Sequence, residues 1–177
     1  MSYINKKVAV LGAGESGEAA AVLLAEEGAM VTVLDSAEEN RLRQKIEALD
    51  RRGIRVLAGR GALEEPEPYD LAVLSPGIDP SAPLVQNFLR KRIDMIGELE
   101  LAYEMCRCPI IGITGTNGKT TTTQLIERML NACGLRTVAA GNIGPAFAAR
   151  VRQSAGLDIM TLEVSSFQLE TIRRFRP

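Results

Sequence analysis

Hydrophobic positions alternate between two spacings along this 177-residue chain. Short runs of Val, Ile, Leu and Ala are followed by longer segments in which apolar residues recur every three or four positions. This alternation is typical of β-α-β units that build a parallel sheet, so we predict an α/β fold. The predicted strands cover residues 7–11, 30–34, 54–57, 70–74, 110–114, 137–140 and 158–163. The predicted helices cover residues 16–27, 38–52, 82–90, 98–105, 119–132 and 167–175.

The strand pattern starts again at Pro109, which predicts two successive α/β units. We assign residues 1–96 to the first unit and residues 97–177 to the second, with the boundary between Asp94 and Arg107. The second unit has three recognisable strands, whereas an all-parallel sheet needs cover on both faces. We therefore expect these residues to form the front portion of a longer enzyme.

Charge and hydropathy narrow the classes of partner. The chain has 21 Lys and Arg residues against 22 Asp and Glu residues, so it provides no overall field for binding nucleic acid or an anionic membrane. No apolar run approaches the ~20 residues that span a bilayer, and we expect a cytoplasmic protein.

The absence of histidine and the spacing of the cysteines exclude several kinds of catalytic and metal site. The absence of histidine removes Ser-His-Asp triads and most zinc sites from these residues. The cysteines Cys106, Cys108 and Cys133 lack the spacing of a metal site, and their odd number predicts reduced thiols.

The strongest motif lies between the predicted strand 110–114 and the helix that follows. In Thr114-Gly-Thr-Asn-Gly-Lys-Thr-Thr121, glycines allow backbone amides to surround a phosphate, and the helix N-terminus and a lysine add positive charge. Ile113 stands where the strict P-loop pattern has its first glycine, so the motif is a variant; a tight turn with an exposed lysine is the alternative. The predicted ATP-binding residues are Gly115, Thr116, Asn117, Gly118, Lys119, Thr120 and Thr121, and Thr120 is placed to hold Mg²⁺.

A second glycine loop, Gly12-Ala-Gly-Glu-Ser-Gly17, follows the first predicted strand, and Asp35 ends the second. This arrangement is the fingerprint of a Rossmann-like dinucleotide site, in which the loop approaches a diphosphate and the carboxylate takes hydroxyl or ring-nitrogen donors. The loop does not identify the nucleotide, so a nicotinamide-dependent oxidoreductase stays open at this point, as does a purely structural role for the glycines.

Three further segments follow predicted strands, at the edge where α/β proteins bind ligands. Ser75-Pro-Gly-Ile78 and Gly141-Asn-Ile-Gly144 predict either ligand contacts or plain turns. Glu163 ends a strand parallel to the one feeding the phosphate loop, so its carboxylate is expected at the mouth of that loop, where it would complete a Mg²⁺ site. The alternative is a carboxylate that favours the next helix N-terminus. Ser165, Ser166 and Gln168 then offer polar groups to a substrate or cap that helix.

Taken in order, these segments and Leu162-Glu-Val-Ser-Ser-Phe-Gln-Leu169 closely resemble the Mur ligases of peptidoglycan synthesis, over essentially the whole chain. The Ser75–Ile78 turn together with Ser-Ser-Phe-Gln-Leu resembles the members that add D-glutamate to UDP-N-acetylmuramoyl-L-alanine. Members that form the tripeptide typically have histidine where Phe167 stands. The resemblance implies that residues 1–96 bind the UDP part of the substrate, that residues 97–177 begin the central ATPase domain, and that a C-terminal D-glutamate-binding domain is absent.

The resemblance also implies the roles of individual residues. Lys119 and Glu163 would be catalytic, with Thr120 and Glu163 on Mg²⁺. The implied substrate-binding residues are Gly14, Glu15, Ser16, Asp35, Ser36, Ser75, Gly77, Asn142, Ser165 and Gln168. The implied reaction transfers the γ-phosphoryl group of ATP to the alanyl carboxylate, and the D-glutamate amine then attacks the acyl phosphate to form an amide. We expect the full-length protein to be a monomer.

Residues that complete the reaction in the family lie beyond these 177, so we expect binding without turnover by this chain alone. A non-catalytic nucleotide-binding module is the remaining alternative.

Overall fold

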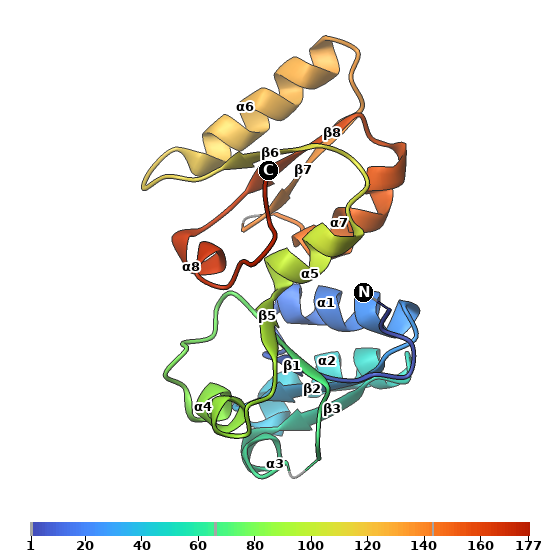
Figure 1. Cartoon of the computed structure of the whole chain (residues 1–177), viewed down its shortest axis with the longest axis vertical. Helices are drawn as coiled ribbons and strands as arrows, with labels where there is room; N and C mark the ends of the chain where they lie inside the picture. Colours follow the sequence, from blue (N-terminus) through green and yellow to red (C-terminus); the bar gives the residue numbers. More distant parts are fainter. Residues whose placement is uncertain (1, 66, 143) are drawn as a thin grey trace. The chain divides into compact units, whose positions relative to one another are not determined.

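The computed structural model describes residues 2–65, 67–142 and 144–177. The chain forms two compact units, Met1–Glu98 and Leu99–Pro177, and each contains its own parallel sheet (Figure 1). None of the helices in the described part of the chain is long and apolar enough to cross a membrane.

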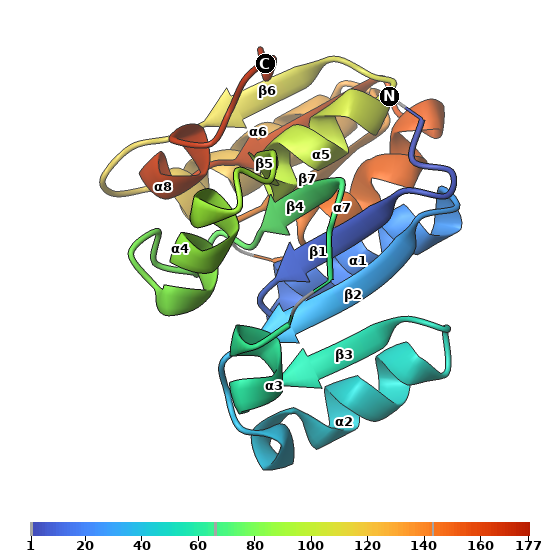
Figure 2. The same ribbon diagram turned by 60° about the horizontal axis from the view of Figure 1, so that its bottom comes forward.

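The first unit has five parallel strands in the order β3-β2-β1-β4-β5, the strand order of the Rossmann fold. The strands are β1 (Lys7–Leu11), β2 (Met30–Asp35), β3 (Arg55–Ala58), β4 (Leu71–Leu74) and β5 (Met95–Gly97). The helices are α1 (Glu15–Glu26), α2 (Glu39–Asp50), α3 (Gly59–Leu63) and α4 (Pro83–Arg90). Helices α1 and α2 cover one face of the sheet, and α3 and α4 lie on the other (Figure 2).

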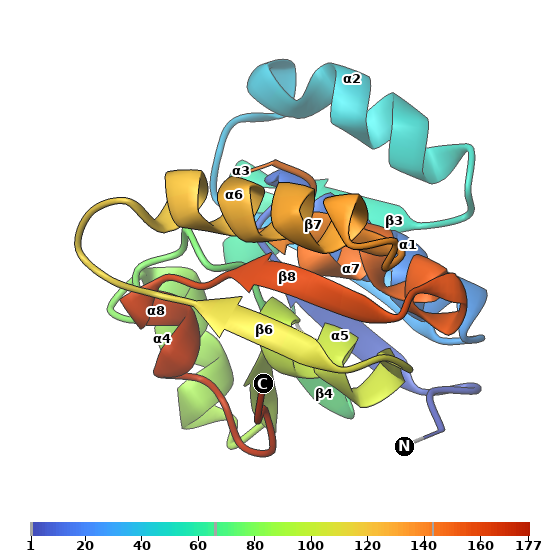
Figure 3. The ribbon, with the colours of Figure 1, turned by 90° about the horizontal axis from the view of Figure 1, so that it is seen from above.

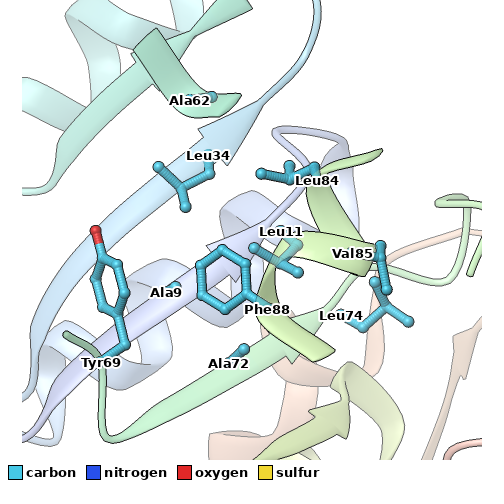
Figure 4. Packing of buried hydrophobic residues seen from close by; sticks show 10 residues of the cluster. All are labelled: Ala9, Leu11, Leu34, Ala62, Tyr69, Ala72, Leu74, Leu84, Val85 and Phe88. Carbon is cyan, nitrogen blue, oxygen red and sulfur yellow. The ribbon is translucent and has the colours of Figure 1, made fainter. Parts of the chain in front are cut away.

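The core of this unit follows from the two-residue period of its strands. In β1, Ala9 and Leu11 point to the face covered by α4, while Val8 and Val10 point to the opposite face. Figure 4 shows the hydrophobic cluster on the face that contains Ala9 and Leu11, where Phe88 of α4 lies over the sheet. Both faces are covered, so the central residues of the strands are mainly apolar, as expected for a parallel sheet.

The second unit has three parallel strands in the order β6-β8-β7, which are β6 (Ile110–Ile113), β7 (Thr137–Gly141) and β8 (Ile159–Glu163). Its helices are α5 (Glu98–Met105), α6 (Lys119–Ala132), α7 (Phe147–Arg150) and α8 (Ser166–Leu169), with a 3₁₀ segment, η1, at Val151–Gly156. Helix α6 runs along one face and packs against all three strands (Figure 3). The central position of β8 places the end of that strand between the ends of β6 and β7.

The predicted α/β class and all seven predicted strands are confirmed, with boundaries within one residue. The predicted helix over residues 167–175 is wrong, because α8 ends at Leu169. The backbone amides of Arg173, Arg174 and Phe175 instead donate to the buried carboxylate of Glu100, at 2.9, 2.8 and 3.1 Å. These amides are therefore not available for helical bonds. Elements too short for a periodic signal were not predicted, namely α3, β5, α7 and η1.

Candidate functional site

The phosphate-loop motif lies between the end of β6 and the start of α6. Gly115 has φ 150° and Gly118 has φ 78°, and Gly118 is the residue that precedes the first turn of α6. A left-handed conformation at these positions favours glycine, which explains why the motif contains glycine there. Residues 114–118 are exposed, so the loop and the N-terminal end of the 14-residue helix face solvent. Such an end carries partial positive charge and free amide donors.

Lys119 is the first residue of α6, and its side chain folds back over the loop. Its Nζ donates to the carbonyl oxygen of Gly115 at 2.9 Å and to that of Thr116 at 3.5 Å. These carbonyls keep the positive charge of Lys119 at the loop. The ammonium group has three donors and can turn, so it can exchange one of these acceptors for another. Thr121, in the same first turn, is exposed.

Glu163 lies beside this loop, as its position at the end of β8 predicts. The parallel register pairs Ile113 with Glu163, and the Thr120 hydroxyl donates to Oε2 of Glu163 at 2.8 Å. The side-chain amide of Asn142 donates to Oε1 of the same carboxylate at 3.2 Å. The structure thus brings together Thr120, Asn142 and Glu163 from three separate segments.

Close approach of β7 to β8 positions Asn142. A Cβ on Gly141, whose φ is 122°, would lie 2.1 Å from the carbonyl oxygen of Glu163, so only glycine fits. The Asn142 amide nitrogen then donates to that same carbonyl at 2.9 Å. Ile143, the next residue of the predicted Gly141–Gly144 segment, lies outside the described residues.

These side chains suit a hard divalent cation. Glu163 is only 2% exposed, and no lysine or arginine forms an ion pair with it in the described ranges. Buried carboxylates are usually paired with a cation or coordinate a metal. Mg²⁺ prefers oxygen ligands at about 2.1 Å in octahedral geometry, which sets neighbouring ligands about 3 Å apart. The 2.8 Å separation of Thr120 Oγ1 and Glu163 Oε2 fits that spacing.

Ser165 and Gln168 form a capping box at the start of α8. The Ser165 hydroxyl accepts from the Gln168 amide nitrogen at 3.3 Å, and the Gln168 side-chain oxygen accepts from the Ser165 amide nitrogen at 2.9 Å. The helix-cap alternative thus describes both side chains here. A role in binding substrate stays a prediction for the hydroxyl proton of Ser165 and the amide group of Gln168.

The first glycine loop is shaped by two close approaches. Gly12 has φ 98°, and a Cβ on Gly17 would lie 1.9 Å from the Gly12 carbonyl oxygen, so α1 packs directly on the loop. Gly14 is exposed, and a Cβ added to it would meet no atom within 4 Å. Glu15 and Ser16 follow in the first turn of the 12-residue helix α1. The backbone at Gly14 is therefore open to a ligand from solvent.

Asp35 holds this loop in place. Its Oδ2 accepts from the amide nitrogen of Ala13 at 2.7 Å and its Oδ1 accepts from that of Ala37 at 2.8 Å, while Ser36 between them is exposed. Each carboxylate oxygen retains a further acceptor site for a ligand hydroxyl or ring nitrogen. Lys45 of α2, which the motifs did not single out, donates from Nζ to the carbonyl oxygen of Ala13 at 2.5 Å.

The Ser75–Ile78 turn packs against the same loop. A Cβ on Gly12 would lie 2.7 Å from Cδ1 of Ile78 and 3.1 Å from Cβ of Ser75. Ser75 is buried, and its Oγ has no hydrogen-bond partner among the described residues. Gly77 is exposed. The predicted residues of the first unit therefore gather around the glycine loop, with Ser75 beneath it and Gly77 at the surface.

The cysteines lie apart from these groups. Cys106 and Cys108 are half-buried with 4.0 Å between their sulfur atoms, and Cys133 is exposed. The pKa of Cys108 is raised to about 11, mainly by burial and in smaller part by the neighbouring Cys106, so Cys108 is a thiol at neutral pH. No group of three or more potential metal-ligating His, Cys, Asp or Glu residues occurs in the described ranges.

Comparison with known families decides the identity of this α/β pair. Residues 6–97 match the N-terminal domain of the MurD-like Mur ligases, which is more than half of the chain, and residues 113–176 match the Mur ligase middle domain. The chain belongs to the Mur ligase family.

Individual Mur ligases show the extent of this likeness. The chain is 46% identical to a UDP-N-acetylmuramoylalanine–D-glutamate ligase of Geobacillus sp. (strain WCH70) and 45% identical to one of Streptococcus agalactiae serotype III (strain NEM316). Each match covers 99% of this chain and 39% of the relative, so the chain spans about two fifths of the length of these ligases.

Solved structures support the fold. A UDP-N-acetylmuramate:L-alanyl-γ-D-glutamyl-meso-diaminopimelate ligase from Neisseria meningitides superposes with a TM-score of 0.53 at 20% identity, over 92% of this chain and 55% of that one. A murein peptide ligase from Psychrobacter arcticus 273-4 gives a TM-score of 0.52 at 17% identity, over 92% of this chain and 39% of that one.

Proposed function

We propose that these residues provide the UDP-substrate-binding and ATP-binding parts of a ligase that adds D-glutamate to UDP-N-acetylmuramoyl-L-alanine. The observation that carries the proposal is the arrangement of Thr120 and Glu163 beside the loop that bears Lys119. The identity of 44–46% to ligases named for this reaction supports the choice of substrates.

The ATP half of the proposed reaction uses the second unit. The exposed amides of Gly115–Gly118 would surround the terminal phosphates, with Thr121 in the first turn beside them. Lys119 would exchange the Gly115 carbonyl for a phosphate oxygen, because an anion is the stronger acceptor for an ammonium group. Thr120 and Glu163 would hold Mg²⁺, with Asn142 fixing the carboxylate. ATP and Mg²⁺, when bound, supply the phosphoryl group and the charge neutralisation that activate the alanyl carboxylate.

The substrate half of the proposed reaction concerns binding of the UDP-linked substrate. Gly14, Glu15 and Ser16 would offer backbone amides to the diphosphate, and Asp35 and Ser36 would meet the uridine. The proposed muramoyl contacts are Ser75, Gly77, Asn142, Ser165 and Gln168. The amine of D-glutamate then displaces phosphate from the activated carboxylate and forms the amide bond. For this step the chain's residues contribute alignment and charge stabilisation rather than a covalent intermediate.

Thermal shift measurements test the ligand assignment. UDP-N-acetylmuramoyl-L-alanine at 100 times its dissociation constant should stabilise the chain by ~2.7 kcal/mol, and NADH should not. A shift with NADH and none with the UDP substrate would reject the proposal in favour of an oxidoreductase.

Substitution of Lys119 tests the ATP site separately. Lys119→Ala should reduce binding of MgATP at least tenfold and leave binding of the UDP substrate unchanged, because a charge-assisted hydrogen bond contributes about 1.5–3 kcal/mol. Lys91→Ala is the matched control, since Lys91, like Lys119, donates to a backbone carbonyl. Its acceptor is the carbonyl of Glu65 at 3.0 Å, in a segment without predicted site residues. Isothermal titration calorimetry of both variants measures the effect; full MgATP affinity in Lys119→Ala would exclude this loop as the phosphate site.

A further inference from the structure

Lys45 occupies a position on α2 where the helix pattern favours an apolar residue. It lies three residues after Leu42 and four before Leu49, and both leucines are buried on the side of α2 that packs on the sheet. The positions three and four residues away hold Arg41, Leu42, Ala48 and Leu49. No carboxylate within α2 is therefore spaced to pair with Lys45.

The ammonium group of Lys45 instead reaches the glycine loop. Its Nζ donates to the Ala13 carbonyl at 2.5 Å, while the Ala13 amide donates to Asp35 at 2.7 Å. Both backbone polar groups of Ala13 are thus bonded, and its amide is not available to a ligand. Lys45 keeps two donors beyond the one that Ala13 uses, and no ion pair involves it in the described ranges.

A second observation points to a ligand at the same place. The Oγ of Ser75, a residue 5% exposed, has no partner among the described residues and lies 2.8 Å from where a Cβ on Gly17 would be. Gly17 is in the first turn of α1, whose N-terminal end begins after the open Gly14. A half-buried cation, a helix N-terminus and an unpaired hydroxyl therefore meet at one loop, and each suits an anion with several oxygens.

We propose that Lys45 is a substrate-binding residue of the first unit, which provides the positive charge that binds the diphosphate of the UDP substrate. The inference rests on the proposed function and adds a residue to it. Lys45 would donate to a diphosphate oxygen from the side of α2, while Gly14, Glu15 and Ser16 donate from the backbone of α1.

A comparison of UDP with uridine tests this charge, since the two ligands differ only in the diphosphate. Lys45→Met should raise the dissociation constant of UDP about 10- to 100-fold and that of uridine less than about twofold. Lys45→Arg should stay within about fivefold of the wild type for both ligands, and increasing salt should weaken UDP binding more in the wild type than in Lys45→Met. Lys91→Met is the control and should bind both ligands as the wild type does.

Calorimetric titration of each purified chain distinguishes the outcomes. Wild-type affinity for UDP in Lys45→Met overturns the inference and leaves the proposed function standing. An equal loss for UDP and uridine in a folded Lys45→Met also overturns it, because the lysine then only shapes the loop. If the first unit of Lys45→Met does not fold, as judged by circular dichroism and by hydrogen exchange in β1–β5, Lys45→Gln and Lys45→Arg are compared in the same way. A wild-type chain that binds neither UDP nor uridine overturns the proposed function and this inference together.

Discussion

At the residue scale, Gly141 determines whether the Glu163 carboxylate has its partners. Its φ of 122° and the 2.1 Å approach of a Cβ to the Glu163 carbonyl predict that Gly141→Ala costs about 3 kcal/mol or more of unfolding free energy. The substitution should also weaken MgATP binding, because Asn142 moves away from Glu163. Urea denaturation and calorimetry measure the two effects.

Gly134→Ala provides the matched control for this substitution. Gly134 also has a positive φ, 82°, but nothing lies within 4 Å of its Cβ position. We expect a cost of about 1 kcal/mol there, from backbone strain alone, and unchanged MgATP binding. Equal costs at the two glycines would show that the contact with Glu163 is not what requires glycine at position 141.

The contacts of some candidate site residues can be predicted from the sequence alone, and those of others cannot. The neighbourhood of Thr120 and Glu163 is predictable. Glu163 ends strand β8 and Thr120 follows strand β6, and the carboxyl ends of these parallel strands lie at one edge of the sheet. Lys45 is not predicted by a motif, because its contact depends on how far α2 lies from the glycine loop. The sequence indicates its role only by placing a lysine on the apolar side of a helix. The pairing of Ser165 with Gln168 fits the capping-box spacing, which competes with the substrate-binding interpretation of the same residues.

At the element scale, the segment after α8 is held by one side chain of α5. Glu100 is 1% exposed and accepts from three backbone amides, those of Arg173, Arg174 and Phe175. Glu100→Gln replaces one acceptor oxygen with a donor group and leaves at least one of these three amides without its acceptor, at a cost of about 2 kcal/mol. Hydrogen exchange at residues 173–175 should become faster in this variant.

Glu170→Gln is the control for that element, because Glu170 is exposed and lies in the same segment. It should leave both stability and exchange at residues 173–175 unchanged. Slow exchange at these amides in Glu100→Gln would mean that the carboxylate does not hold the segment.

The elements also differ in how well the sequence predicts their ends. Helix α6 and strand β1 have the predicted bounds, since their apolar periods extend over enough residues to be recognised. The helix predicted for residues 167–175 stops early because Glu100, 73 residues before Arg173, takes its amides. Tertiary contacts of this kind leave no local signal in the chain.

At the scale of the whole molecule, the chain consists of two units with separate sheets and separate glycine loops. The strand pattern that starts again at Pro109 predicts this organisation from sequence. The domain assignments, UDP binding in the first unit and ATP binding in the second, stay predictions that rest on the two loops.

Hydrogen exchange with each ligand tests those assignments across the molecule. Since a ligand at 100 times its dissociation constant adds ~2.7 kcal/mol to the unit that binds it, UDP should slow exchange in β1–β5 and MgATP should slow exchange in β6–β8. Lys119→Ala should weaken the effect of MgATP and retain that of UDP, because the lysine bonds to the second loop. Protection of β1–β5 by MgATP in the absence of UDP would contradict separate binding, since a ligand confined to one unit stabilises the other only through coupling between them.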